Sequence, residues 1–359
     1  MSLKIGIVGL PNVGKSTLFN ALVKGSHAEA ANYPFCTIEP NVGIVEVPDE
    51  RLTPLVQVSK SKKTVPAVIE FVDIAGLVRG ASKGEGLGNQ FLAHIRECDA
   101  IAMVVRFFEN SDVVHVEGKI DPADDIATIE TELQLADIST VEKRIYSAEK
   151  EIKAGSKESK TVHSGLKKVM DMLYEGKNAR EAKLDDLEKE ALKGLGLMTQ
   201  KPIIYIANCS EEQLSNWAEI KEKNKAIKFI PICAKIESEL NELNEADQKE
   251  YLTTLGLDDT GLNHLIKEAY KILGLITYFT SGEMETRAWT IKKGWTAPQS
   301  AGVIHTDFER GFIAAEVVPW QDLFAQEGWS GAKLKGLVRT EGKTYITKDG
   351  DVMLFRFNV

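Results

Sequence analysis

The feature that most constrains this chain is a phosphate-binding loop close to the N-terminus. Residues 9–16 read Gly-Leu-Pro-Asn-Val-Gly-Lys-Ser and fit the pattern G-x-x-x-x-G-K-S. In such a loop the glycines let backbone N–H groups close on phosphates, the lysine reaches the β and γ oxygens, and the serine hydroxyl ligates Mg²⁺. A β-branched run, 5–8, precedes the loop and a helical run, 16–23, follows it, which favours this interpretation over an ordinary glycine turn. We therefore expect the chain to bind a nucleoside triphosphate through Asn12, Val13, Gly14, Lys15, Ser16 and Thr17, with Lys15 also acting in catalysis.

Length and composition limit the class of protein. A chain of 359 residues exceeds the size at which one core keeps growing, so two or three domains are expected. No apolar stretch is long enough to span a bilayer and no signal peptide precedes the first strand, so we expect a cytoplasmic protein without a membrane partner. The four cysteines lack C-x-x-C spacing, which fits reduced thiols. The net charge of −9 argues against coating by nucleic acid and leaves a local basic face open; no DNA partner is expected.

Short apolar runs alternate with helical patterns and predict an α/β domain with a largely parallel sheet. The expected strands are Lys4–Val8, Val42–Val47, Val68–Val72, Ala100–Phe107, Ile203–Ala207 and Ile227–Ile232. Between the fourth and fifth strands, residues 124–199 carry apolar residues at helical spacing and predict two long antiparallel helices that break at 154–159. The mixed charges there are typical of a solvated coiled-coil face, with partner binding as a second interpretation.

The pattern of apolar residues changes again after a helical stretch at 262–273. Short β-like runs at 287–291, 312–318 and 352–357 predict a small α+β domain. We therefore expect a nucleotide-binding domain formed by residues 1–123 and 200–275, a helical insertion at 124–199, and a C-terminal domain at 276–359.

Two further segments fit the phosphate-binding loop. Asp73-Ile74-Ala75-Gly76 is a D-x-x-G motif at the end of an apolar strand, which places a carboxylate beside Mg²⁺ and a glycine N–H near the γ-phosphate. Upstream, Thr37 offers a hydroxyl that could complete the Mg²⁺ shell. Ser16, Thr37 and Asp73 are therefore the expected metal ligands, with Gly76 as a nucleotide contact.

These segments resemble those of the Obg-related branch of P-loop GTPases. Residues 34–41 read P-F-x-T-I-x-P-N, and residues 73–88 form a long second switch studded with glycines. Within that branch the chain is most similar to the YchF or Obg-like ATPase family. The resemblance implies a coiled-coil insertion in the G domain and a C-terminal β-grasp domain of the TGS type, whose segment 297–308 matches. It extends over essentially the whole chain.

The base-reading motif departs from that of GTPases. A guanine-specific protein carries N-K-x-D after the fifth strand, whereas this chain has Asn208-Cys209-Ser210-Glu211. Adenine lacks the groups that the aspartate would pair with, and polar mismatches discriminate strongly. The N-x-x-E pattern matches that of the YchF family and implies ATP; a degraded GTP site is the alternative. Residues 233–235 resemble the loop that closes over the base. We expect base contacts from Asn208, Cys209, Glu211 and Ala234.

The residue that would position the attacking water is absent. Ras-like enzymes have a glutamine after D-x-x-G, and this chain has Leu77, so intrinsic turnover should be slow. His115 and His94 are candidates to replace it, and the resemblance favours His115 as catalytic. Asn12 matches an asparagine that binds K⁺ in related enzymes, which adds K⁺ to Mg²⁺ as a candidate cofactor. Oxidation of Cys36, next to Thr37, is a further hypothesis.

Two functions remain open from the sequence. One is an ATPase whose nucleotide state controls docking of the helical and C-terminal domains on a ribosome or another RNA–protein partner, with the large subunit or rRNA as the expected ribosomal contact. The other is a nucleotide-gated binding scaffold with incidental hydrolysis. Basic residues of the C-terminal domain, interleaved with aromatic residues, fit either RNA contact or a solvated sheet face. They are Lys292, Lys293, Lys333, Lys335, Arg339, Lys343 and Lys348, with Trp289, Trp295 and Tyr345.

Overall fold

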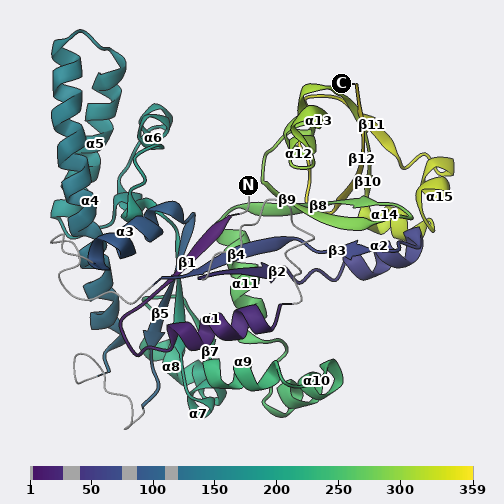
Figure 1. Cartoon of the computed structure of the whole chain (residues 1–359), viewed down its shortest axis with the longest axis horizontal. Helices are drawn as coiled ribbons and strands as arrows, with labels where there is room; N and C mark the ends of the chain where they lie inside the picture. Colours follow the sequence, from purple (N-terminus) through teal and green to yellow (C-terminus); the bar gives the residue numbers. More distant parts are fainter. Residues whose placement is uncertain (1–2, 27–40, 75–86, 110–119, 359) are drawn as a thin grey trace.

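The computed structural model describes residues 3–26, 41–74, 87–109 and 120–358 (Figure 1). Its first sheet has the strand order β2-β4-β1-β5-β6-β7. All neighbouring strands are parallel except β2, which pairs antiparallel with β4. The strands are β1 (Lys4–Val8), β2 (Val42–Glu46), β4 (Val68–Asp73), β5 (Ala100–Arg106), β6 (Ile203–Asn208) and β7 (Phe229–Ile232). The predicted α/β domain with a largely parallel sheet is thus present.

Helices surround this sheet and connect its strands (Figure 1). Every residue of β5 is buried, as expected for a central parallel strand covered on both faces. Strand β7 begins two residues later than predicted, because the Ile227 N–H closes a turn on the Asn224 carbonyl at 3.1 Å. The helices are α1 (Lys15–Lys24), α3 (Leu87–Glu97), α7 (Glu211–Ser215), α8 (Trp217–Lys223), α9 (Ala234–Leu240), α10 (Glu245–Thr254) and α11 (Gly261–Ile272).

The helical insertion follows β5. Helix α4 (Pro122–Lys153) begins at an Asp121 cap and packs against α5 (Glu158–Tyr174), with the break where the sequence predicts it. The second helix is only about half as long as the first, which corrects the expectation of two long helices. The chain then returns through η3 (Ala179–Glu181), α6 (Asp186–Leu192) and η4 (Met198–Gln200), because two further capped turns pack against the hairpin.

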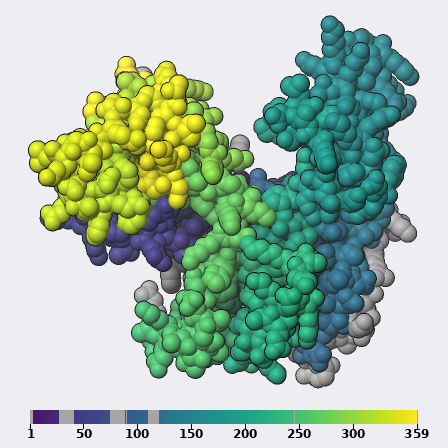
Figure 2. Space-filling view, turned by 180° about the vertical axis from the view of Figure 1, so that it is seen from behind, coloured from purple at the N-terminus to yellow at the C-terminus, as the bar shows by residue number. Residues whose placement is uncertain are grey.

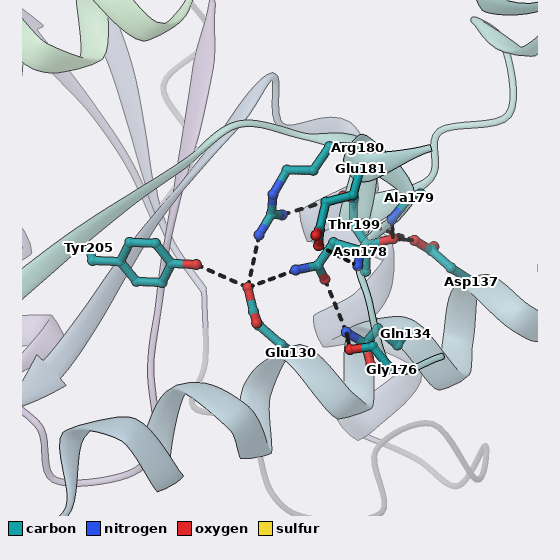
Figure 3. Close-up of polar contacts among 10 residues, drawn as sticks. All are labelled: Glu130, Gln134, Asp137, Gly176, Asn178, Ala179, Arg180, Glu181, Thr199 and Tyr205. Atoms are coloured by element: carbon teal, nitrogen blue, oxygen red, sulfur yellow. Dashed lines mark hydrogen bonds and ion pairs between the residues drawn. The ribbon is translucent and has the colours of Figure 1, made fainter. Parts of the chain in front are cut away.

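Polar contacts, some of them buried, anchor this insertion to the first sheet (Figure 3). Glu130 of α4 accepts hydrogen bonds from Tyr205 of β6 at 3.0 Å and from Asn178 at 3.1 Å, and it pairs with Arg180 at 2.9 Å. Nearby, the Asp137 carboxylate is fully buried and accepts three hydrogen bonds from residues 198–199. Since buried polar groups are costly unless paired, this complete set fixes the base of the hairpin.

The C-terminal part forms a second sheet with the order β11-β10-β12-β8-β9-β3. Its strands are β8 (Leu275–Ser281), β9 (Thr286–Lys292), β10 (Phe312–Pro319), β11 (Arg339–Glu341), β12 (Asp351–Phe357) and β3 (Thr64–Val65). Strand β3 comes from the N-terminal part of the chain. It lies in the segment 49–65, which also contains helix α2 (Leu52–Ser59). The remaining helices are α12 (Ala297–Gly302), α13 (Thr306–Arg310), α14 (Trp320–Ala325) and α15 (Trp329–Leu334).

The helical hairpin and the C-terminal domain project from the first sheet as two separate lobes (Figure 2). Helix α11 contacts both β7 and β8 and so bridges the two sheets. Among the described residues, no helix combines the length and the apolar character that a membrane crossing requires.

Candidate nucleotide-binding site

The phosphate-binding loop joins the C-terminal end of β1 to the start of α1. Gly14 caps α1 with φ of 95°, a left-handed conformation that glycine adopts without strain. Gly9 has no room for a side chain, because an added Cβ would lie 2.6 Å from the Val104 carbonyl oxygen of β5. The loop is therefore shaped to bring backbone N–H groups and the helix N-terminus toward one point, as phosphate binding requires.

Lys15 is buried within this loop, with 8% of its surface exposed. Its Nζ donates a hydrogen bond to the Leu10 carbonyl oxygen at 2.7 Å. Burial lowers the pKa of Lys15 to about 8, and attraction to the Asp73 carboxylate only partly opposes this effect. The ammonium thus has too few charged partners in the protein alone, and phosphate oxygens would supply them.

Ser16 and Asp73 are brought together at the end of β4, although 57 residues separate them. The Ser16 Oγ donates to Asp73 Oδ2 at 3.2 Å. A hydroxyl and a carboxylate beside a phosphate loop are hard oxygen donors of the kind that Mg²⁺ prefers. These two residues therefore fit the metal, and within the described ranges no group of three or more His, Cys, Asp or Glu side chains offers another metal site.

Asn208, the last residue of β6, ties the phosphate loop to the loop after β7. Its Nδ2 donates to the Val13 carbonyl oxygen at 2.8 Å, and its Oδ1 accepts from the Ala234 N–H at 3.3 Å. The side chain also fits closely against Gly14, where an added Cβ would lie 2.1 Å from Nδ2. Both ends of this amide thus hold the site together, so residues predicted from three distant segments meet here.

Cys209 is buried, and its groups are used within the sheet. The Cys209 N–H donates to the Ile232 carbonyl oxygen at 3.0 Å, and burial raises the pKa of its thiol to about 12. The thiol is therefore a neutral packing group, and the N–H of this residue is used within the sheet.

Glu211 opens α7 and is exposed. Ser210, which precedes it, forms a capping box with Gln213 in the first turn of the helix. The Gln213 Nε2 also donates to the Phe107 carbonyl oxygen at 2.8 Å. Our sequence reasoning overlooked this pair, although S-x-x-Q before a helix is a recognised capping signature. The box fixes the direction in which the chain leaves Cys209.

His94 lies away from the phosphate loop. It is exposed on α3 and lines a cavity with Lys4, which begins β1, whereas the loop follows the other end of that strand. The lining of this cavity also includes Asn41 and Val72 and contains no residue of the phosphate loop. The predicted residues Cys36, Thr37, Gly76, Leu77 and His115 lie outside the described residues.

Two of the basic residues of the C-terminal domain make contacts within that domain. Lys333 of α15 pairs with Glu316 at 2.8 Å, whereas the Arg339 guanidinium lies over the Tyr345 ring, 5.5 Å from its centre. The three aromatic residues of this set are half-buried and pack against the core of the domain: Trp289, Trp295 and Tyr345. This arrangement favours ordinary core aromatics over a base-stacking surface.

Comparison with known proteins identifies the family. The chain is 53% identical to the "Ribosome-binding ATPase YchF" of Bacillus subtilis and 54% identical to that of Pasteurella multocida, over 100% of each chain. The chain belongs to the YchF family. A YchF C-terminal model, described as a protein of unknown function, matches residues 275–358, and a model described as a 50S ribosome-binding GTPase matches residues 4–143.

Solved structures agree on the YchF fold. A Schizosaccharomyces pombe YchF GTPase is 40% identical, covers 99% of this chain and 98% of its own, and superposes with a TM-score of 0.87. A GTP-binding protein from Pyrococcus horikoshii superposes with a TM-score of 0.59 over 99% of this chain and 100% of its own, at 18% identity, and shares the fold. The P-loop GTPase-type α/β domain and the C-terminal domain are therefore those of the YchF family.

Proposed function

We propose that this protein is a Mg²⁺-dependent ATPase that prefers ATP over GTP and acts as a nucleotide-controlled switch on the ribosome. The observation that carries the proposal is the loop built around Asn208 and Cys209, which joins a phosphate-binding loop to a base site without the guanine-reading motif. The printed names of the relatives, ribosome-binding ATPase, support the same function.

The phosphate end of the site assigns roles to the chain's own residues. Lys15 exchanges the Leu10 carbonyl for the β and γ phosphate oxygens and thereby regains charged partners. Ser16 and Asp73, with Thr37, would hold Mg²⁺, which when bound neutralises charge on the phosphates. Gly76 adds a backbone N–H. These assignments make the loop an electrostatic cradle for a triphosphate.

The preference for ATP follows from the donors and acceptors at Cys209. Because its N–H is already bonded to Ile232, this position presents a carbonyl acceptor. The 6-amino group of adenine can donate to a carbonyl, whereas the 6-oxo group of guanine would repel it. Glu211 would add a contact near the base, and Asn208 and Ala234 fix the loop around it. A buried polar mismatch of this kind discriminates strongly between substrates.

Hydrolysis should be slow without a partner, because Leu77 cannot orient a water. We assign water positioning to His115, and K⁺ held by Asn12 would add positive charge at the phosphates. Replacing His115 with alanine should cut turnover while ATP affinity stays nearly constant. Equal turnover in potassium and sodium buffers would dismiss the K⁺ assignment.

Ribosome association is assigned to the two projecting lobes, the helical insertion 124–199 and a TGS-type domain at 276–359, while 1–123 and 200–275 form the G domain. The large subunit or its rRNA is the proposed contact, supported by the description of the family model for residues 4–143. A nucleotide-gated scaffold with incidental hydrolysis is the second candidate, which Leu77 favours.

The test compares ATP and GTP in the same two assays, calorimetric binding and turnover with and without ribosomes. The proposal expects tighter binding of ATP and a turnover that ribosomes stimulate. Clearly tighter binding of GTP would overturn the base assignment. Ribosome binding that depends on ATP, with no stimulation of turnover, would favour the scaffold.

A further inference from the structure

The segment between β2 and β4 leaves the first sheet and becomes part of the second. Residues Thr64 and Val65 form β3, which pairs in parallel with Thr286 and Arg287 of β9. Just before it, α2 packs against β8, β9 and α14. The excursion is thus built into the C-terminal domain, and Figure 1 shows it reaching out from β2 and β4 toward β8 and β9.

A shared hydrophobic core joins this excursion to the C-terminal domain. Leu52 and Leu55 of α2 are buried in the same cluster as Phe279 of β8, Leu323 of α14 and Val352 of β12. That cluster continues without interruption into the first sheet. Helix α2 is therefore packed into the C-terminal domain, and the same close-packed core couples it to the first sheet.

Arg51 fastens the beginning of the excursion. Its guanidinium bonds both oxygens of Asp49, at 2.8 and 2.7 Å, and reaches Asp349 before β12 at 2.8 Å. The Asp349 carboxylate also accepts the Thr277 N–H of β8 at 2.9 Å. The guanidinium lies over the Phe279 ring, 5.0 Å from its centre. The bidentate pair with Asp49 orients the guanidinium, and its remaining nitrogen makes the bond to Asp349 that clamps the two parts of the chain together.

Hydroxyl groups fasten the end of the excursion. Ser59 Oγ and Ser281 Oγ are 2.8 Å apart, and Thr286 Oγ1 lies 2.7 Å from both Ser61 Oγ and Ser281 Oγ. The Thr286 N–H donates to the Lys63 carbonyl oxygen at 2.9 Å. Thr286 is fully buried, so these contacts are protected from water.

The strand that follows the excursion, β4, ends at the candidate nucleotide-binding site. Only residues 66 and 67 separate β3 from β4, and β4 ends at Asp73, 3.2 Å from Ser16. Strand β2 pairs with β4 along Val42–Glu46 and stiffens it. The paired strands β2 and β4 therefore connect the candidate metal ligand Asp73 to β3 and so to the C-terminal sheet.

We propose that β2, β4 and the excursion 49–65 form a lever through which Mg²⁺–ATP at the phosphate loop sets the position and rigidity of the C-terminal domain. The inference rests on the proposed function, because it needs a nucleotide at Asp73. A lever fixed at one end by metal–nucleotide and at the other by the Arg51 clamp loses freedom when both ends are engaged. Coupling of this type changes equilibria by about fivefold or more.

The test measures hydrogen exchange of the backbone amides of β8 and β9, in the full chain, with and without Mg²⁺ and a non-hydrolysable ATP analogue. Calorimetry on the same samples verifies that the analogue binds. We expect the analogue to slow exchange in β8 and β9 by about fivefold or more. Exchange that stays constant while the analogue binds would overturn the lever and leave the proposed function intact. Failure to bind any nucleotide would instead defeat the proposed function, and the lever with it.

Two variants test whether the named contacts carry the coupling. Arg51→Met breaks the clamp, and the double variant Ser61→Ala with Thr286→Val removes hydroxyls with little change of shape. Each should reduce the analogue's effect on β8 and β9 at least about threefold. Arg144→Met is the matched control, because Arg144 pairs with Glu151 within the distant helical hairpin, and it should respond like the parent chain. A full response in both test variants would overturn the proposal.

Discussion

The buried Lys15 makes a prediction that can be tested without nucleotide: Lys15→Met should stabilise the empty protein at neutral pH. The folded chain binds the Lys15 proton less tightly than the unfolded chain, with pKa values of about 8 and 10.5. Holding the charge in the fold at pH 7 therefore costs about 3 kcal/mol. Methionine removes this cost and loses one hydrogen bond to Leu10, worth about 1 kcal/mol. We expect a net gain of about 2 kcal/mol.

The gain should depend on pH in a definite direction. Between pH 8 and 10.5 the unfolded chain holds more protons than the fold, so the stability of the parent chain rises with pH. At about pH 9.5 the cost of Lys15 falls to about 1 kcal/mol, and the advantage of Lys15→Met nearly disappears. The Lys15→Met protein lacks this pH-dependent contribution to its stability.

The measurement is urea unfolding of both proteins without nucleotide at about pH 7 and pH 9.5, since the difference between them cancels the other titrating groups. Lys24→Met, an exposed lysine at the end of α1, is the control and should change stability by less than about 0.5 kcal/mol at both pH values. A Lys15→Met protein that is less stable at pH 7, or whose advantage is equal at both pH values, would refute the reasoning.

Three further predictions concern buried polar groups. Asn208→Ala should cost about 2 kcal/mol in unfolding experiments and weaken ATP binding at least about tenfold by calorimetry, because it leaves the Val13 carbonyl and the Ala234 N–H without their partner; unchanged affinity would contradict its bridging role. Asp137→Ala should cost about 3 kcal/mol by loss of three buried hydrogen bonds, while the exposed Asp171→Ala should cost little in the same urea titration. Burial raises the pKa of Glu237 from 4.5 to about 7, so the fold binds this proton more tightly than the unfolded chain, and stability should fall by about 3 kcal/mol as pH rises from 4.5 past 7; Glu237→Gln should flatten that decline, and an unaltered pH profile would exclude the effect.

The strands of the first sheet were predictable because most are short, largely apolar runs, and the central strand β5 is the continuous apolar run typical of a buried parallel strand. The second sheet was predicted only in part. Strand β8 follows α11 after one turn and reads as a continuation of its apolar pattern, and β3 has only two residues, too few for periodicity to detect. Their partners lie far away in the sequence, and pairing at such distance leaves no local signal.

In the site, too, residues with a local sequence signature were predictable and residues brought together by tertiary structure were not. The phosphate loop and Asp73 have short, specific signatures, and the structure places Ser16 beside Asp73 as the D-x-x-G motif suggests. By contrast, Glu130 and Arg180 read as charges on a solvated helical face. Their pairing with Tyr205 depends on where α4 crosses β6, which is a tertiary property. The capping box at Ser210 was visible in the sequence and was overlooked.

The insertion of β3 beside β9 also constrains how the chain can be made. Ser61 and Thr286 lie 225 positions apart in the sequence, so β3 cannot pair with β9 until the chain has been synthesised as far as residue 287. A contact of such high sequence separation is slow to form, because a long loop must close before it is rewarded. A fragment that begins at residue 276 would lack β3 and leave β9 as an open sheet edge, a template for intermolecular pairing. The C-terminal sheet is thus a unit of structure but not a unit of the polypeptide.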